Sequence, residues 1–148
     1  MGSYLNPSSK NFFESINSKI YVDKSELIQH TNAAINTRQK FLCVSRPRRF
    51  GKSMGMDMLA AYYSFGRDSA HLFDDLKISK DPNYHTHLNQ YNVIKINMQE
   101  FLSSTSSMDA MLKQLKKYIT FDILDEYEDK VRFRDEDNFV QDKLFHVI

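Results

Sequence analysis

Residues 40–66 have the sequence KFLCVSRPRRFGKSMGMDMLAAYYSFG. A continuous apolar run comes first, a basic turn follows, and apolar residues then recur at helical spacing, which predicts the order strand, loop, helix. Lys40 to Ser45 has apolar residues on both faces, as a central strand of a parallel sheet does. Gly66 is expected to end the helix. The apolar face of that helix is formed by Met54, Met58, Leu59 and Tyr62.

The turn SRPRRFGKS, Ser45 to Ser53, has the residue types that a phosphate-binding loop requires. Such a loop offers backbone N–H groups, a lysine for the terminal phosphates and a hydroxyl for magnesium, at the positive end of a helix dipole. Gly51, Lys52 and Ser53 match the last three positions of G-x-x-x-x-G-K-[ST]. Arg46 stands where the first glycine would fall, so the loop is a variant.

We therefore predict a nucleotide-phosphate site in this turn. Lys52 is expected to contact the β and γ phosphates, and Ser53 to bind the metal ion. The amides from Arg49 to Ser53 would surround the anion, while Arg46 and Arg48 adjust the charge around it. The residues expected to bind the nucleotide are Arg46, Arg48, Arg49, Phe50, Gly51, Lys52, Ser53 and Met54.

Three further elements are expected outside this segment. Asp23 and Glu26 have capping-box spacing, which predicts a helix from about Lys24 to Ile35. The apolar stretch from Asn92 to Met98, NVIKINM, predicts a second strand. A long amphipathic helix is expected near Met108 to Tyr127.

Nucleotide hydrolysis additionally needs a carboxylate at the end of a second buried strand, which holds magnesium. The best formal candidate is FDILDE, with Asp125 and Glu126, and the other is INMQE, with Glu100, which follows the second expected strand. Asp122 interrupts the apolar run of FDILDE, and Ile119 and Ile123 continue the helical spacing, so we interpret FDILDE as the end of the long helix.

Several motifs resemble the bacterial family called AAA-ATPase-like: YVDKSELI, SRPRRFGKS, LAAYYSFGRDSAHLFDDLKI and HLNQYNVIKINMQEF. The resemblance runs from about Phe12 to Phe133. In that family the phosphate loop typically has Arg at the position of Arg46, which makes the variant ordinary. The resemblance implies a P-loop fold, ATP and Mg2+ as ligands, and, in many members, a C-terminal nuclease-like domain of the PD-(D/E)XK type.

The expected fold class is accordingly α/β and P-loop NTPase-like, with an incomplete parallel sheet flanked by helices. We expect residues 1–11 to form a flexible tail and residues 12–148 to form the N-terminal part of the ATPase domain. The resemblance places the acidic strand after the stretch RFRDEDNF, which suggests a truncated domain. We therefore expect ATP binding, with weak or absent hydrolysis by this chain alone.

Composition narrows the function classes. The chain of 148 residues has a formal net charge of +1, so no global field draws it to nucleic acid or to a membrane surface. Its single cysteine, Cys43, lies in an apolar run, where a buried small hydrophobe is the expected role, and it suits a reducing compartment. No apolar run is long enough to cross a bilayer, and we expect a cytoplasmic protein.

Two other function classes stay open. The chain could be an interaction protein that pairs with a fuller ATPase, another partner or a second copy of itself. Alternatively, Arg46, Arg48 and Arg49 could contact nucleic-acid phosphates.

His85 and His87 have a spacing compatible with a metal on a strand, although an exposed loop is the expected setting. The aromatic pair Tyr62–Tyr63 is expected to pack the loop helix against the sheet.

Overall fold

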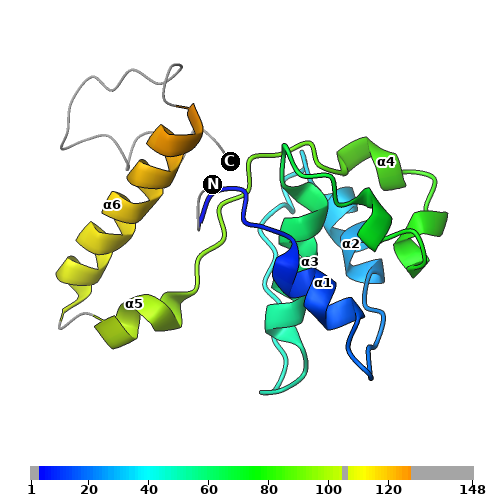
Figure 1. Cartoon of the computed structure of the whole chain (residues 1–148), viewed down its shortest axis with the longest axis horizontal. Coiled ribbons are helices and arrows are strands. Elements are labelled where there is room, and N and C mark those ends of the chain that lie inside the picture. The colour runs from blue at the N-terminus through cyan, green and yellow to red at the C-terminus, as the bar shows by residue number, and fades with distance from the viewer. Residues whose placement is uncertain (1–3, 105–106, 128–148) are drawn as a thin grey trace. The chain divides into compact units, whose positions relative to one another are not determined.

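The computed structural model describes residues 4–104 and 107–127, which divide into two compact units. The first, here called the N-terminal unit, runs from Asn6 to Lys95. The described parts of the second, the α5–α6 unit, are residues 4–5, 96–104 and 107–127. The N-terminal unit contains α1 (Lys10–Ile16), α2 (Glu26–Ala34), α3 (Lys52–Tyr63), the 3-10 helices η1 (Ala70–Leu72) and η2 (Lys77–Lys80), and α4 (Tyr84–His87) (Figure 1).

The core of the N-terminal unit forms where α1 and α2 pack around α3. Tyr62 is fully buried, and its ring meets Phe73 edge-on at 5.6 Å between centroids. Phe12 of α1 stacks on the same Phe73 at 5.0 Å. Aromatic burial of this kind is a main stabilising term in a small domain. The other buried members of this cluster are Ile28, Met58, Ala61, Leu72, Leu76, Ile78, Tyr84 and Leu88.

The segment around Asn89 closes the C-terminal end of α3. The last carbonyl groups of a helix have no partner within the helix. Here the backbone N–H of Asn89 donates to the Tyr62 carbonyl at 2.7 Å, and that of Tyr91 to the Tyr63 carbonyl at 2.9 Å. The Asn89 amide also donates to the Ser64 carbonyl at 3.0 Å. A second segment of chain therefore completes the end of α3.

The α5–α6 unit contains α5 (Met98–Ser104) and α6 (Met108–Tyr127). The buried Phe101 lies 5.6 Å from the ring of Tyr4, which stacks on Tyr118 at 6.0 Å. The Asp122 carboxylate accepts hydrogen bonds from the N–H groups of Tyr4, at 2.6 Å, and Leu5, at 3.2 Å. Asp122 thus satisfies backbone donors near the chain start from within α6.

The bounds of α6 agree with the helix expected near Met108 to Tyr127, and FDILDE is helical, as its spacing predicted. The expected helix at residues 24–35 is present as α2, slightly shorter. α5 was not expected from the sequence. No helix in the described ranges combines the length and apolar character that a membrane span requires.

The expected parallel sheet is wrong. Residues 40–45 form no strand, and they are exposed, with Phe41 at 80%, Leu42 at 53% and Val44 at 51%. A central parallel strand needs hydrogen-bonded neighbours and cover on both faces. Within the described ranges, β-type pairing occurs only as isolated bridges, such as the parallel bridge between Ser64 and Tyr91. The fold of these residues is therefore helical, and the α/β class is not correct for them.

The second expected strand, from Asn92 to Met98, is also wrong. Residues 92–97 form no strand. The Val93 carbonyl accepts from the Asn6 backbone N–H at 2.7 Å, and the Val93 N–H donates to the Asn6 side-chain oxygen at 2.8 Å. Met98 already begins α5. Asn6 has a φ of 45° and is fully buried. Its side-chain oxygen, distant in the sequence, takes the place of a neighbouring strand as the acceptor for the Val93 N–H.

The structure also bears on the predictions for Cys43, for the N-terminal tail and for the acidic strand. Cys43 is exposed, so the prediction of a buried small hydrophobe is wrong. Its apolar neighbours are exposed with it, because no sheet covers them. α1 begins at Lys10, within the range expected as a tail. The expected place of the acidic strand, after RFRDEDNF, lies outside the described residues.

Candidate functional site

The segment from Arg46 to Ser53 comprises a mostly exposed turn, Arg46 to Gly51, and the first two residues of α3, Lys52 and Ser53. Arg49 and Gly51 both have left-handed backbone conformations, with φ of 65° and 77°. Glycine adopts this region freely, whereas other residues rarely do. Gly51 occupies the N-cap position, and Lys52 is the first residue of the helix. The sequence expectation of a loop followed immediately by a helix is therefore confirmed, although no strand precedes the loop.

The start of α3 exposes backbone donors. Gly55 N–H donates to the Gly51 carbonyl at 2.9 Å, which closes the first helical turn. The N–H groups of Lys52, Ser53 and Met54 precede that bond and have no acceptor within a regular helix. Gly51 has no side chain that could cap them. These donors lie at the positive end of the helix dipole, where an anion is stabilised.

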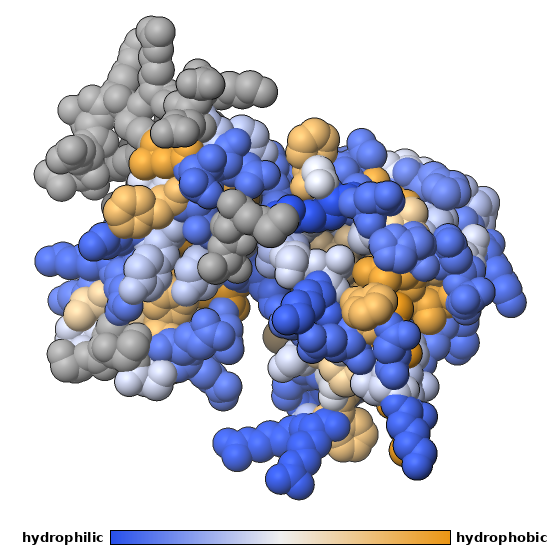
Figure 2. All heavy atoms as spheres, viewed as in Figure 1, coloured by the Kyte–Doolittle hydropathy of each residue, from blue (hydrophilic) through white to orange (hydrophobic). Residues whose placement is uncertain are grey.

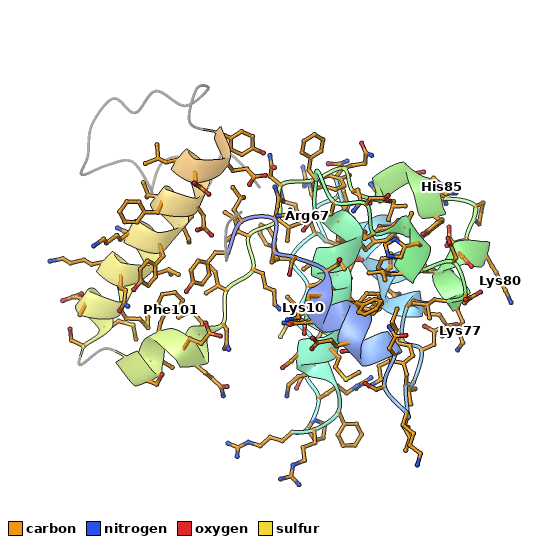
Figure 3. All side chains as sticks on the ribbon, in the orientation of Figure 1. Lys10, Arg67, Lys77, Lys80, His85 and Phe101 are labelled. Atoms are coloured by element: carbon orange, nitrogen blue, oxygen red, sulfur yellow. The ribbon has the colours of Figure 1, made fainter. Side chains whose placement is uncertain are left out.

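Basic side chains surround this end of α3. Lys52 Nζ donates to the carbonyl of Arg46, which folds the lysine back across the loop. Arg46, Arg48 and Arg49 are exposed, and in the described part of the chain none of them forms an ion pair. Figure 2 shows hydrophilic side chains projecting at this end, and Figure 3 shows long side chains tipped with nitrogen leaving the loop before α3. The loop thus concentrates uncompensated positive charge.

Two cavities border the turn. The larger has a volume of about 600 Å³ and the smaller about 270 Å³. Lys24, Phe50, Gly51 and Gly55 line both of them. The remaining lining of the larger cavity is Leu27, Leu42, Val44, Arg46, Lys52, Met56 and Leu59, so it is apolar with a basic edge. A volume of this size lies in the range of small-molecule sites.

Lys24 belongs to the site, although sequence spacing did not indicate it. Its ammonium donates to the Phe50 carbonyl at 2.7 Å, across 26 positions of sequence. A Cβ atom added to Gly51 would lie 3.0 Å from the same Nζ. The available signal is the YVDKS motif, in which the capping-box spacing predicts a helix cap at Asp23.

The structure gives Asp23 a different role. Ser25 is the N-cap residue of α2, and Asp23 accepts from the Ser25 N–H at 2.8 Å and from the Lys77 N–H at 2.8 Å. Partial burial acts to raise the pKa of Asp23, but these backbone donors, first Lys77 and then Ser25, outweigh it and lower the pKa below its ordinary value. Asp23 therefore joins the start of α2 to η2, and the capping-box prediction is wrong.

The aromatic pair on α3 packs against helical neighbours and not against a sheet. Tyr62 donates to the Tyr84 carbonyl at 2.5 Å. Tyr63 contacts Thr31 of α2 at 2.6 Å and donates to Asn32 at 2.6 Å. Burial raises the pKa of Tyr63 well above its usual range. Both hydroxyls thus hold α3 in place.

The expected histidine pair lies in a short helix. His85 and His87 belong to α4, with His85 exposed and His87 hydrogen-bonded to the Tyr91 hydroxyl at 2.6 Å. Neither is on a strand or in a loop. Across the described ranges, no group of three or more histidine, cysteine or acidic side chains is arranged to hold a metal ion.

Comparison with known protein families gives a match over residues 9–148 to the AAA-ATPase-like family, described as predicted AAA-ATPases. The chain has no significant match among curated proteins or among solved structures. The family match covers the loop, α3 and the helices that position them. It covers well over half of the sequence, and the chain therefore belongs to the AAA-ATPase-like family.

Proposed function

We propose that this chain binds ATP with magnesium through the segment from Arg46 to Ser53. The observation that carries the proposal is the start of α3, where Gly51 in the left-handed conformation is followed at once by Lys52 and Ser53. Free N–H groups, a lysine and a hydroxyl then meet at the positive end of one helix. Family membership supports nucleotide use in general.

Lys52 is expected to change its hydrogen-bond acceptor when ATP binds. In the described structure its ammonium is bound to the neutral carbonyl of Arg46. A phosphate oxygen carries formal charge and accepts a stronger hydrogen bond than a carbonyl does. Lys52 would therefore leave Arg46 for the β and γ phosphates, while the exposed hydroxyl of Ser53 would bind magnesium.

The larger cavity offers room for the rest of the nucleotide. Its basic edge, with Lys24, Arg46 and Lys52, suits the phosphate groups. Its apolar lining suits the flat faces of a nucleobase. Hydrolysis by the isolated chain is expected to be weak, because no carboxylate is among the described residues that line this cavity.

The test is a calorimetric titration of the purified chain with Mg-ATP. Wild-type protein is expected to bind in the micromolar range, which corresponds to about −8 kcal/mol. Lys52→Ala should weaken binding at least about tenfold, because a charged hydrogen bond to phosphate is lost. Lys80→Ala is the matched control, since Lys80 is an exposed lysine at the end of η2 (Figure 3). A folded wild-type chain that binds no ATP would contradict the proposal.

A second candidate function is binding of nucleic-acid phosphates by the three exposed arginines. The observation in its favour is that Arg46, Arg48 and Arg49 form no ion pair within the described ranges. Binding of this kind falls steeply as salt rises. A DNA affinity that survives Lys52→Ala and is lost on replacing the arginines would favour this function over ATP binding.

A further inference from the structure

We propose that Lys24 is a positioning residue of the phosphate loop, which orients the peptide between Phe50 and Gly51 so that the Gly51 N–H can meet phosphate. The inference rests on the proposed function of the loop. Its starting point is one contact, the 2.7 Å hydrogen bond from Lys24 Nζ to the Phe50 carbonyl. Lys24 comes from the segment before α2 and not from the loop itself.

The base of Lys24 is fixed on both sides. Asp23 accepts from the N–H of Lys77 at 2.8 Å, and the Ser25 hydroxyl accepts from the N–H of Ile78 at 3.1 Å. Ser25 and Ile78 are fully buried. Lys24 lies between these two anchored residues, so its ammonium reaches the loop from a backbone that η2 holds in place.

The direction of the Phe50 carbonyl decides where the next N–H points. No cis peptide bond occurs in the described part of the chain. In a trans peptide the C=O and N–H groups point in opposite directions. With the Phe50 carbonyl held toward Lys24, the Gly51 N–H faces away from the ammonium. If the Gly51 N–H pointed toward the Lys24 ammonium instead, it could not donate to a phosphate that Lys52 also contacts.

The peptide before Gly51 needs the hydrogen bond from Lys24, because glycine alone would not fix its orientation. Gly51 has a φ of 77° and can exchange between backbone regions more easily than other residues can. Rotation of the Phe50–Gly51 peptide would turn the N–H out of place at small cost. Lys24 opposes that rotation by a hydrogen bond with a charged donor, which is stronger than a neutral one. The loop is thus restrained at two carbonyls, Phe50 by Lys24 and Arg46 by Lys52.

The first experiment compares ATP affinity among three variants of the full chain. Lys24→Met removes the donor and keeps the length of the side chain, and should weaken ATP binding about tenfold. Lys24→Arg keeps a charged donor and should restore most of the affinity. Lys80→Met is the matched control and should bind as wild type does. Thermal unfolding of each variant checks that the fold is retained.

The second measurement separates positioning from charge. The chain has only four glycines, so selective 15N-glycine labelling gives a simple amide spectrum in which Gly51→Ala identifies the Gly51 signal. Without nucleotide, Lys24→Met should displace the Gly51 signal, while Lys80→Met leaves it in place. At saturating Mg-ATP, the Lys24→Met signal should not reach its wild-type bound position, and Lys24→Arg should bring it back.

The outcomes are distinguishable. A wild-type chain that binds no ATP would overturn the proposed function and this inference together. ATP binding by wild type, with unchanged affinity in Lys24→Met, would overturn the inference alone. Weakened affinity with an unchanged Gly51 signal would also overturn it, because Lys24 would then act only through its charge.

Discussion

Two buried serines near the C-terminal end of α3 differ in one respect, the partners of their hydroxyl groups. Ser69 donates to the Ala61 carbonyl at 2.6 Å and accepts from the Asn89 amide at 2.9 Å. The Ser64 hydroxyl, equally buried, has no hydrogen-bond partner among the described residues. A buried hydroxyl stabilises a fold only where its hydrogen bonds are made.

We therefore predict opposite results for two matched substitutions. Ser69→Ala should lower the free energy of unfolding by about 1–3 kcal/mol, because it leaves buried partners unsatisfied. Ser64→Ala should change it by less than about 0.5 kcal/mol or raise it, because an unpaired hydroxyl is removed. Urea denaturation of both variants measures the difference. Equal destabilisation by the two substitutions would contradict these hydrogen-bond assignments.

Asp23 makes stability depend on pH in the acid range. Backbone donors lower its pKa in the folded chain from the ordinary value of 3.8, against the opposing effect of burial. A lowered folded-state pKa gives a stabilisation that is complete above about pH 4 and is lost as the pH falls further toward the folded value. Asp23→Asn should therefore reduce the loss of stability between about pH 4 and pH 2.

The measurement is thermal unfolding of wild type and variant across that pH range. Asp68→Asn is the control, since Asp68 is an exposed aspartate in the same unit with no hydrogen bond in the described part of the chain. The control is expected to keep the wild-type slope. An identical slope for wild type and Asp23→Asn would show that the contacts with Lys77 and Ser25 do not form in solution.

At the scale of elements, the sequence predicted helices well where apolar residues recur at helical spacing. α6 has the expected bounds, and α2 lies inside its expected range. The apolar run at residues 41–44 carries no period, and such a run cannot by itself distinguish a buried strand from an exposed segment. Residues 41–44 would become a buried strand only if neighbouring strands paired with them, and the described ranges contain no such strand.

The exposure of that run gives an element-scale prediction. Phe41 is 80% exposed and Phe73 is fully buried, so the same substitution should have different effects. Phe41→Ala should change the free energy of unfolding by less than about 0.5 kcal/mol. Phe73→Ala should cost about 3–5 kcal/mol, because it removes the ring on which Phe12 and Tyr62 pack. Urea denaturation measures both, and a cost of several kcal/mol for Phe41→Ala would mean that residues 40–45 are buried.

The candidate site was predictable in part. Gly51, Lys52 and Ser53 are neighbours in the sequence, and their position at the start of a helix followed from the change of period. Lys24 was not predictable from spacing, because its contact with Phe50 depends on how α2 and η2 place the YVDKS motif. Local patterns indicate a loop, whereas the residue that restrains it comes from tertiary structure.

At the scale of the whole molecule, the family match spans both units, but the candidate site lies in one of them. Every described residue assigned to the site belongs to the N-terminal unit. Nucleotide binding should therefore change the dynamics of that unit first, around the start of α3. The α5–α6 unit supplies none of the proposed ligands.

Hydrogen–deuterium exchange of the full chain, with and without Mg-ATP, tests the central claim most directly. We predict slower exchange on binding in peptides that cover residues 46–56, because phosphate oxygens would accept from the amides at the start of α3. The same peptides should show no change in Lys52→Ala. Unchanged exchange at residues 46–56 under saturating Mg-ATP, or protection confined to α6, would contradict the account.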